Sequence, residues 1–232
     1  GLYAVDRDGS RHKVLNPSFK TYREFGSRVF KAVELFDPLT DEGGDILVSV
    51  RKGGGRFRED RSFYGNIVRL NTLTAKEKRV VFNRGDILQF VADREKIIRI
   101  GVAQHGLIRT ILHRRNPESD WEEVYSGDFR TAIAPLGFGK NPDILYVAAP
   151  NGDKKALFQF DLKAKKLGRM IFTHPTYDVP AGPPIVSEKT GKVLGVRYEA
   201  ERPQVYWFDK DYQQYQAMID NALPGMANDI KN

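Results

Sequence analysis

The sequence predicts an all-β fold: part of a β-propeller with about four blades, part of another blade and a short C-terminal helix. One observation is a β-branched, apolar run that opens four times after a charged or turn residue, at Asp45–Val48, Lys96–Arg99, Asp143–Tyr146 and Lys192–Gly195. A second is an alternating strand that runs to a turn at Asn71, Asn116, Asp161 and Asp209. Successive markers lie 45 to 51 residues apart, which is close to the roughly 40–50 residues of a four-stranded blade.

We expect a single propeller fragment over residues 1–232, with blades at about 33–82, 86–126, 130–172 and 183–222. Residues 1–15 predict a hairpin left from a preceding blade, and residues 16–32 a connection. Asn151-Gly152-Asp153 and Lys189–Lys192 predict tight turns, because Asn and Gly tolerate a positive φ. A small twisted sheet cannot bury both faces alone, so the blades should stack on one another.

The last segment predicts a helix rather than another strand. Asp209 is a plausible N-cap, and Tyr212, Tyr215, Ile219 and Leu223 follow at helical spacing before Pro224-Gly225. A short amphipathic helix at a blade edge is therefore expected.

Composition excludes several classes of function. The chain has 37 basic and 30 acidic side chains, a net charge of +7, but the basic residues are scattered, so we expect no nucleic-acid partner. Apolar stretches such as Ile144–Pro150 are far shorter than the about 20 residues of a membrane-spanning helix, so we expect a soluble protein with no membrane partner. Cysteine is absent, which removes disulfides, thiolate metal sites and a cysteine nucleophile and leaves the compartment open.

No motif predicts a catalytic, cofactor-binding or metal-binding residue, and substrate-binding residues are unknown. A Gly-x-Ser-x-Gly nucleophile elbow is missing. The four histidines, His12, His105, His113 and His174, lack metal-ligand spacing, and we expect them at the surface or hydrogen-bonded.

Four further features have a functional and a structural interpretation. The acidic cluster of Asp37, Asp41, Glu42 and Asp45 favours a solvated hairpin over a calcium loop, and Gly53–Gly55 favours an insertion loop over a phosphate cradle. Tyr206-Trp207-Phe208 favours core packing over a stacking platform, because consecutive strand residues point to opposite faces. Asp86 and Glu199 are carboxylates that a propeller glycosidase could use, but no spacing singles out a pair.

Several segments together resemble the N-terminal propeller of bacterial prolyl oligopeptidase-family serine peptidases, the acylaminoacyl-peptidase and dipeptidyl-aminopeptidase-like group. These segments are Trp121–Tyr125, Leu157–Asp161, His174–Val179, Gly191–Tyr198, Arg202–Asp209 and Ala222–Gly225. The resemblance implies a propeller that gates and selects peptide substrates for an α/β-hydrolase domain that would follow in the same polypeptide. It also implies that the triad lies in that domain, so no activity is expected from this chain alone and no cofactor is needed.

The alternative is a stand-alone TolB-like propeller that acts as a protein-binding module. Both hypotheses are compatible with a bacterial cytoplasm or periplasm. Open blade edges expose unpaired strands, so a homo-oligomer is a possible partner in either case.

Overall fold

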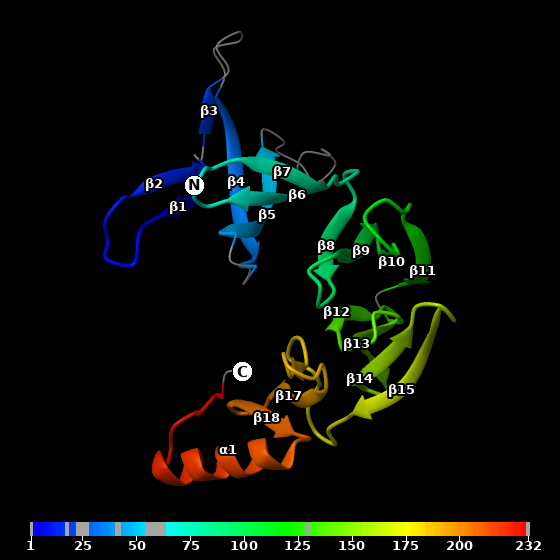
Figure 1. Cartoon of the computed structure of the whole chain (residues 1–232). Helices are drawn as coiled ribbons and strands as arrows, with labels where there is room; N and C mark the ends of the chain where they lie inside the picture. The colour runs from blue at the N-terminus through cyan, green and yellow to red at the C-terminus, as the bar shows by residue number, and fades with distance from the viewer. Residues whose placement is uncertain are drawn as a thin grey trace. The chain divides into compact units, whose positions relative to one another are not determined.

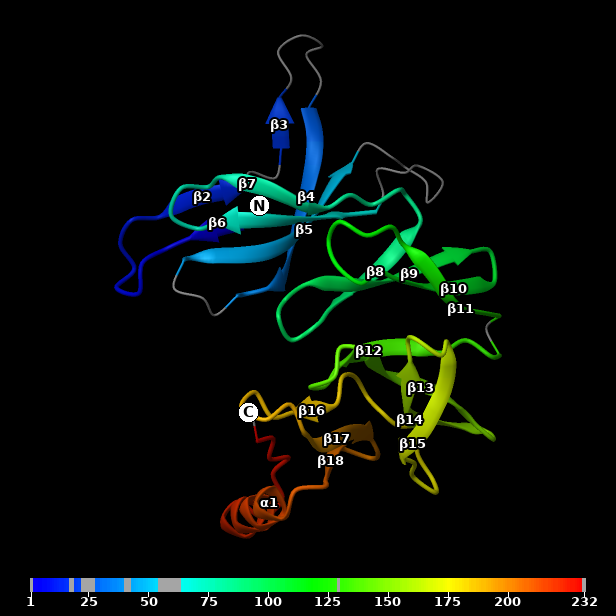
Figure 2. The same ribbon diagram turned by 45° about the vertical axis from the view of Figure 1, so that its right-hand side comes forward.

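A computed structural model describes residues 2–16, 19–21, 28–39, 43–53, 64–128 and 130–230. The chain forms two compact units, Gly1–Leu88 and Gln89–Asn232. Both consist almost wholly of short antiparallel sheets (Figures 1 and 2). The fold is therefore all-β and of the β-propeller type, as the repeat predicts.

The first unit combines a hairpin with a five-stranded sheet. The hairpin pairs β1 (Leu2–Ala4) with β2 (Lys13–Asn16). The sheet follows chain order through β3 (Phe19–Thr21), β4 (Arg28–Asp37), β5 (Asp45–Gly53), β6 (Asn66–Asn71) and β7 (Glu77–Val81). Leu15 packs against Val48, Val50, Val68 and Leu70, which joins the hairpin to the sheet. Residues 16–32, expected to be a connection, contain β3 and the start of β4. The prediction missed these strands because the repeat markers identify only two strands of each blade.

The second unit carries three sheets, and its boundary with the first unit falls within β8, the first strand of these sheets. The second sheet orders β8 (Ile87–Ala92), β9 (Ile98–His105), β10 (Ile108–His113) and β11 (Glu122–Gly127). The third orders β12 (Ala134–Phe138), β13 (Ile144–Asn151), β14 (Lys154–Asp161) and β15 (Lys166–Phe172). The fourth has three strands, β16 (Ile185–Val186), β17 (Val193–Glu199) and β18 (Pro203–Trp207).

Apolar side chains between these sheets form the core of the second unit. Ile100 and Ile111 of the second sheet pack with Leu145 and Phe160 of the third. Tyr146 and Leu157 of the third sheet pack with Val196 of the fourth. Each sheet thus buries a face against the next one, which is the stacking that a propeller requires.

The helix α1 (Lys210–Ala222) follows β18, and it is the only helix in the described ranges (Figure 2). The side chain of Asp209 accepts hydrogen bonds from the backbone N–H groups of Asp211 and Tyr212, which confirms the predicted N-cap. Tyr212 stacks on Trp207 of β18, with ring centroids 4.9 Å apart. Within the described residues, no helix has the length and apolar character needed to cross a membrane.

Candidate functional site

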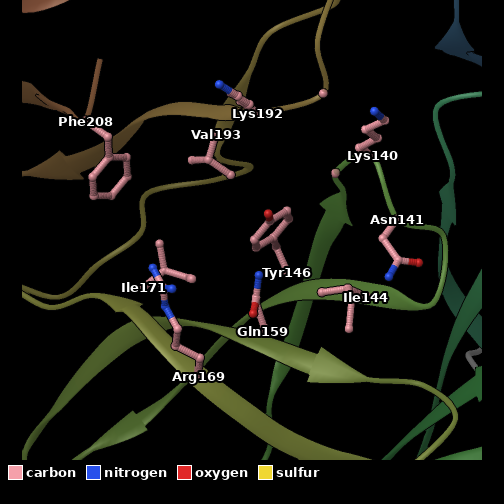
Figure 3. Close-up of a pocket in the computed structure, with 12 residues that line it drawn as sticks. Lys140, Asn141, Ile144, Tyr146, Gln159, Arg169, Ile171, Lys192, Val193 and Phe208 are labelled. Atoms are coloured by element: carbon pink, nitrogen blue, oxygen red, sulfur yellow. The ribbon is translucent and has the colours of Figure 1, made fainter. Parts of the chain in front are cut away.

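An open pocket of about 630 Å³ lies between the third and fourth sheets of the second unit (Figure 3). We call it the basic pocket. Its walls come from the turn between β12 and β13, from β13 to β15, from the turn before β17, and from the residue after β18. The lining residues are Gly139, Lys140, Asn141, Ile144, Tyr146, Gln159, Arg169, Ile171, Gly191, Lys192, Val193 and Phe208.

Two buried glycines let the turns of the neighbouring sheets approach closely. Gly191 has φ +71°, and a Cβ atom there would lie 2.8 Å from the Cβ atom of Lys140. A Cβ atom on Gly139 would lie 2.9 Å from the ring of Tyr146. A larger residue at position 191 would push the two turns apart, and one at position 139 would displace the ring of Tyr146. The glycines therefore set the spacing between Lys140 and Lys192.

The apolar part of the pocket belongs to the packed core. Tyr146 is buried in the cluster between the third and fourth sheets, and Ile171, Val193 and Phe208 pack against that cluster. Phe208 also lies edge-on to Phe172, with ring centroids 5.9 Å apart. A ligand would therefore meet a preformed apolar surface.

The polar part of the pocket carries positive charge only. Lys140, Arg169 and Lys192 line it, no carboxylate does, and within the described part of the chain these three side chains form no ion pair. Figure 3 shows the two lysines on one side of Tyr146, with Arg169 and Gln159 on the other. Asn141 accepts a hydrogen bond from the N–H of Asp143 through Oδ1, which leaves its amide nitrogen to donate. The arrangement suits an anionic group that needs hydrogen-bond donors.

A smaller recess of about 230 Å³ lies at the end of β10 in the second sheet. It is lined by His113, Arg114, Arg115, Ser119, Asp120 and Glu122. Among the described residues, no group of three or more potential ligands could hold a metal ion.

The predicted histidines differ in their surroundings. His12 stacks on Tyr3, and His174 stacks on Tyr198 while its Nδ1 accepts hydrogen bonds from the N–H groups of Thr176 and Tyr177. His113 is buried, and its Nε2 has no hydrogen-bond partner. The expectation of exposed or hydrogen-bonded histidines is therefore wrong for His113. The reason is that β10 is an inner strand of its sheet and its last residue, His113, is buried.

The acidic, glycine and carboxylate candidates of the sequence form no common site in the described ranges. Asp45 accepts a hydrogen bond from the Asn71 amide and pairs with Arg69, while Asp41, Glu42, Gly54 and Gly55 lie outside the described residues. Asp86 lies in the first unit, and Glu199 lies in the second.

The aromatic run after Val205 packs on two faces, as its strand spacing predicts. Trp207 is buried with Ile185 and Leu194 of its own sheet, and Tyr206 stacks on Phe172 of the third sheet.

Sequence reasoning missed the three cations of the basic pocket. One coarse signal was available, because Lys140 lies three residues before the repeat marker that begins at Asp143, and Lys192 opens the marker of the next repeat. Equivalent turns of successive blades lie on the same side of a propeller. Aligning the repeats would have placed Lys140 and Lys192 near equivalent turns, before β13 and β17, but not opposite each other, and Arg169 carries no such signal.

The comparisons with known proteins support the fold alone. TolB from Acinetobacter baumannii is similar in structure, with a TM-score of 0.50 and 8% sequence identity over 88% of this chain and 44% of that chain. This chain thus spans less than half the length of that propeller protein. No family model matches the sequence, and no curated protein is significantly similar to it. The fold and these findings define the class as a β-propeller, and they do not support the prolyl oligopeptidase family in particular.

Proposed function

We propose that this propeller is a non-catalytic binding module that holds an acidic, extended segment of a partner protein in the basic pocket. The observation that carries the proposal is the set of three unpaired cations, Lys140, Arg169 and Lys192, in a pocket without a carboxylate. Phe208, Ile171 and Val193 would pack against apolar side chains of the same segment. A peptide that alternates acidic and apolar side chains would satisfy both surfaces.

Physical magnitudes favour a moderate, salt-dependent interaction. An exposed ion pair contributes up to about 1 kcal/mol, so three of them contribute up to about 3 kcal/mol. That energy corresponds to roughly 150-fold in affinity. Because Lys140 and Lys192 are exposed, salt should weaken binding by screening their charge.

Fluorescence anisotropy with a labelled Glu/Phe peptide tests the proposal. The triple variant Lys140→Ala, Arg169→Ala, Lys192→Ala should bind up to about 150-fold more weakly than the wild type. The matched control removes three exposed lysines of the same unit, Lys155→Ala, Lys166→Ala and Lys210→Ala, and should keep most of the affinity. A Gln/Phe peptide should bind neither protein well. Equal losses in the two triple variants would show that only net charge matters and would refute the pocket.

A narrower proposal is that the bound segment is a peptide substrate and that the module gates a serine peptidase. The sequence segments that resemble prolyl oligopeptidase-family propellers support it, and an α/β-hydrolase domain of the same polypeptide would be the partner. The gene downstream of Asn232 tests it, since a Gly-x-Ser-x-Gly elbow would support gating and a stop codon would contradict it. In both cases the chain alone should not hydrolyse peptide p-nitroanilides.

Self-association through sheet edges is a separate proposal. Among the described strands, β15 pairs with β14 only and β18 with β17 only, so each has an edge that could accept another strand. Sedimentation velocity over a concentration series tests it: a concentration-dependent dimer supports edge pairing, and a monomer throughout contradicts it.

A further inference from the structure

Arg114 is a buried cation that forms no ion pair within the described residues, although the charge of Glu118 favours its charged form. Its side chain donates from Nε to the carbonyl of Ile98 at 2.8 Å and from Nη1 to the carbonyl of Pro117 at 3.1 Å. The guanidinium lies 4.8 Å from the centre of the Trp121 ring. The remaining nitrogen, Nη2, is buried without a partner, and burial lowers the pKa of Arg114. A buried donor on a charged group is costly to leave unpaired, so this nitrogen needs an acceptor.

His113 supplies a second unpaired nitrogen next to the same recess. The residue is 8% exposed, and its Nε2 is buried and has no partner. Burial, followed by the charge of Arg99, lowers the pKa of His113 and so favours the neutral ring. A neutral imidazole can donate one hydrogen bond from a ring nitrogen.

The recess that these residues line is large enough to hold a small ion. Its volume of about 230 Å³ exceeds the roughly 30 Å³ share of one water molecule several times. Glu122 at its edge is already paired with Lys165 at 2.5 Å, whose hydrogen bond and charge lower the pKa of Glu122. Arg115 and Asp120 are exposed and have opposite charges. Asp120 lines the recess and Glu118 acts on Arg114, so both carboxylates would compete with an anion that enters.

We infer that this recess binds one small oxyanion, a carboxylate or a phosphate, which accepts a hydrogen bond from Arg114 Nη2, with His113 as a second donor. Carboxylate and phosphate oxygens accept charge-assisted hydrogen bonds from a guanidinium nitrogen, and such bonds are the stronger kind. This site is separate from the basic pocket, so its test does not depend on the proposed function.

The test uses NMR of the four histidine rings in the full chain, titrated with inorganic phosphate and with acetate at constant ionic strength. One of the two ions should give a saturable shift of the His113 signals. Arg114→Lys, which keeps a charge but removes the Nη2 donor, should weaken binding tenfold or more, the loss of about one charge-assisted hydrogen bond. Arg115→Ala, the neighbouring exposed arginine, should change it by only about twofold. Asp120→Asn should strengthen binding, because it removes a competing charge.

No shift with either ion would overturn the inference, and so would an equal shift in Arg114→Lys or a non-saturating shift shared by all four rings. If Arg114→Lys does not fold by circular dichroism, His113→Gln takes its place, with tryptophan fluorescence as the signal, because Trp121 lies against Arg114. Titrating the acidic peptide instead of free ions distinguishes a carboxylate on a partner's side chain from a free carboxylate ion. A His113 shift with the peptide alone identifies a partner's side chain, and a shift with acetate identifies a free ion.

Discussion

Gly195 lies where the fourth sheet and α1 are held together, and Gly195→Ala should destabilise the second unit. Gly195 pairs with Ile185 on one side and with Trp207 on the other. A Cβ atom there would lie 2.7 Å from the Trp207 ring and 2.9 Å from the carbonyl of Tyr206. Trp207 cannot move away freely, because Tyr212 stacks on it and its Nε1 donates to Gln216 at 3.2 Å.

The magnitude follows from two opposing effects. Overpacking of this kind costs about 1–3 kcal/mol. Replacing glycine by alanine also restricts the unfolded chain, which stabilises the fold by about 0.4–1 kcal/mol. Gly168→Ala in β15 is the matched control, because its Cβ atom would lie 3.4 Å from the nearest atom, an ordinary contact. The difference between the two variants should therefore be about 1–3 kcal/mol.

Urea unfolding, followed by tryptophan fluorescence and by circular dichroism, measures this difference. We expect a lower midpoint for Gly195→Ala and an unchanged or higher midpoint for Gly168→Ala. The midpoints can be compared as stabilities only if the two probes give the same transition. Two compact units could otherwise unfold separately. Equal midpoints for the two variants would refute the contact between Gly195 and Trp207.

Three further predictions concern the core, the helix cap and pH. Phe160→Ala, at a side chain that is 1% exposed, should cost about 3–5 kcal/mol in urea unfolding; a loss below about 1 kcal/mol would contradict its central place in the core. Asp209→Ala removes the acceptor for two N–H groups of α1 and should cost about 1 kcal/mol, with reduced helical circular dichroism, whereas Asp209→Asn should behave as the wild type. The lowered pKa of His113 means that below its ordinary value the unfolded chain binds more protons, so stability should fall as pH drops below about 6.5. His113→Gln should weaken this pH dependence, and an unchanged slope would count against a buried, neutral ring.

The features of the fold that repeat along the chain could be predicted from the sequence. The run from Ile144 forms β13, and Gly152 turns the chain with φ +68° into β14, so that Asn151 pairs with Lys154. The helix cap at Asp209 also follows from local chemistry, because a side-chain oxygen next to free N–H groups needs no distant partner. The extra strand β3 was missed, since no repeated marker lies within Phe19–Thr21.

The functional features depend on contacts between distant residues and could not be predicted in the same way. Lys140, Arg169 and Lys192 come from different strands and turns, and only the close approach of Gly139 and Gly191 brings the lysines together. Arg114 follows an alternating strand and has the sequence signature of an exposed residue. Its burial depends on hydrogen bonds to Ile98 and Pro117 and on the ring of Trp121.

Amide chemical-shift mapping of the acidic peptide on the full chain is the most direct test of the basic pocket as a binding site. The pocket predicts saturable shifts that gather around Lys140, Gln159, Arg169, Lys192 and Phe208. Shifts spread over the exposed lysines of the whole chain, or gathered at residues outside this set, would contradict it.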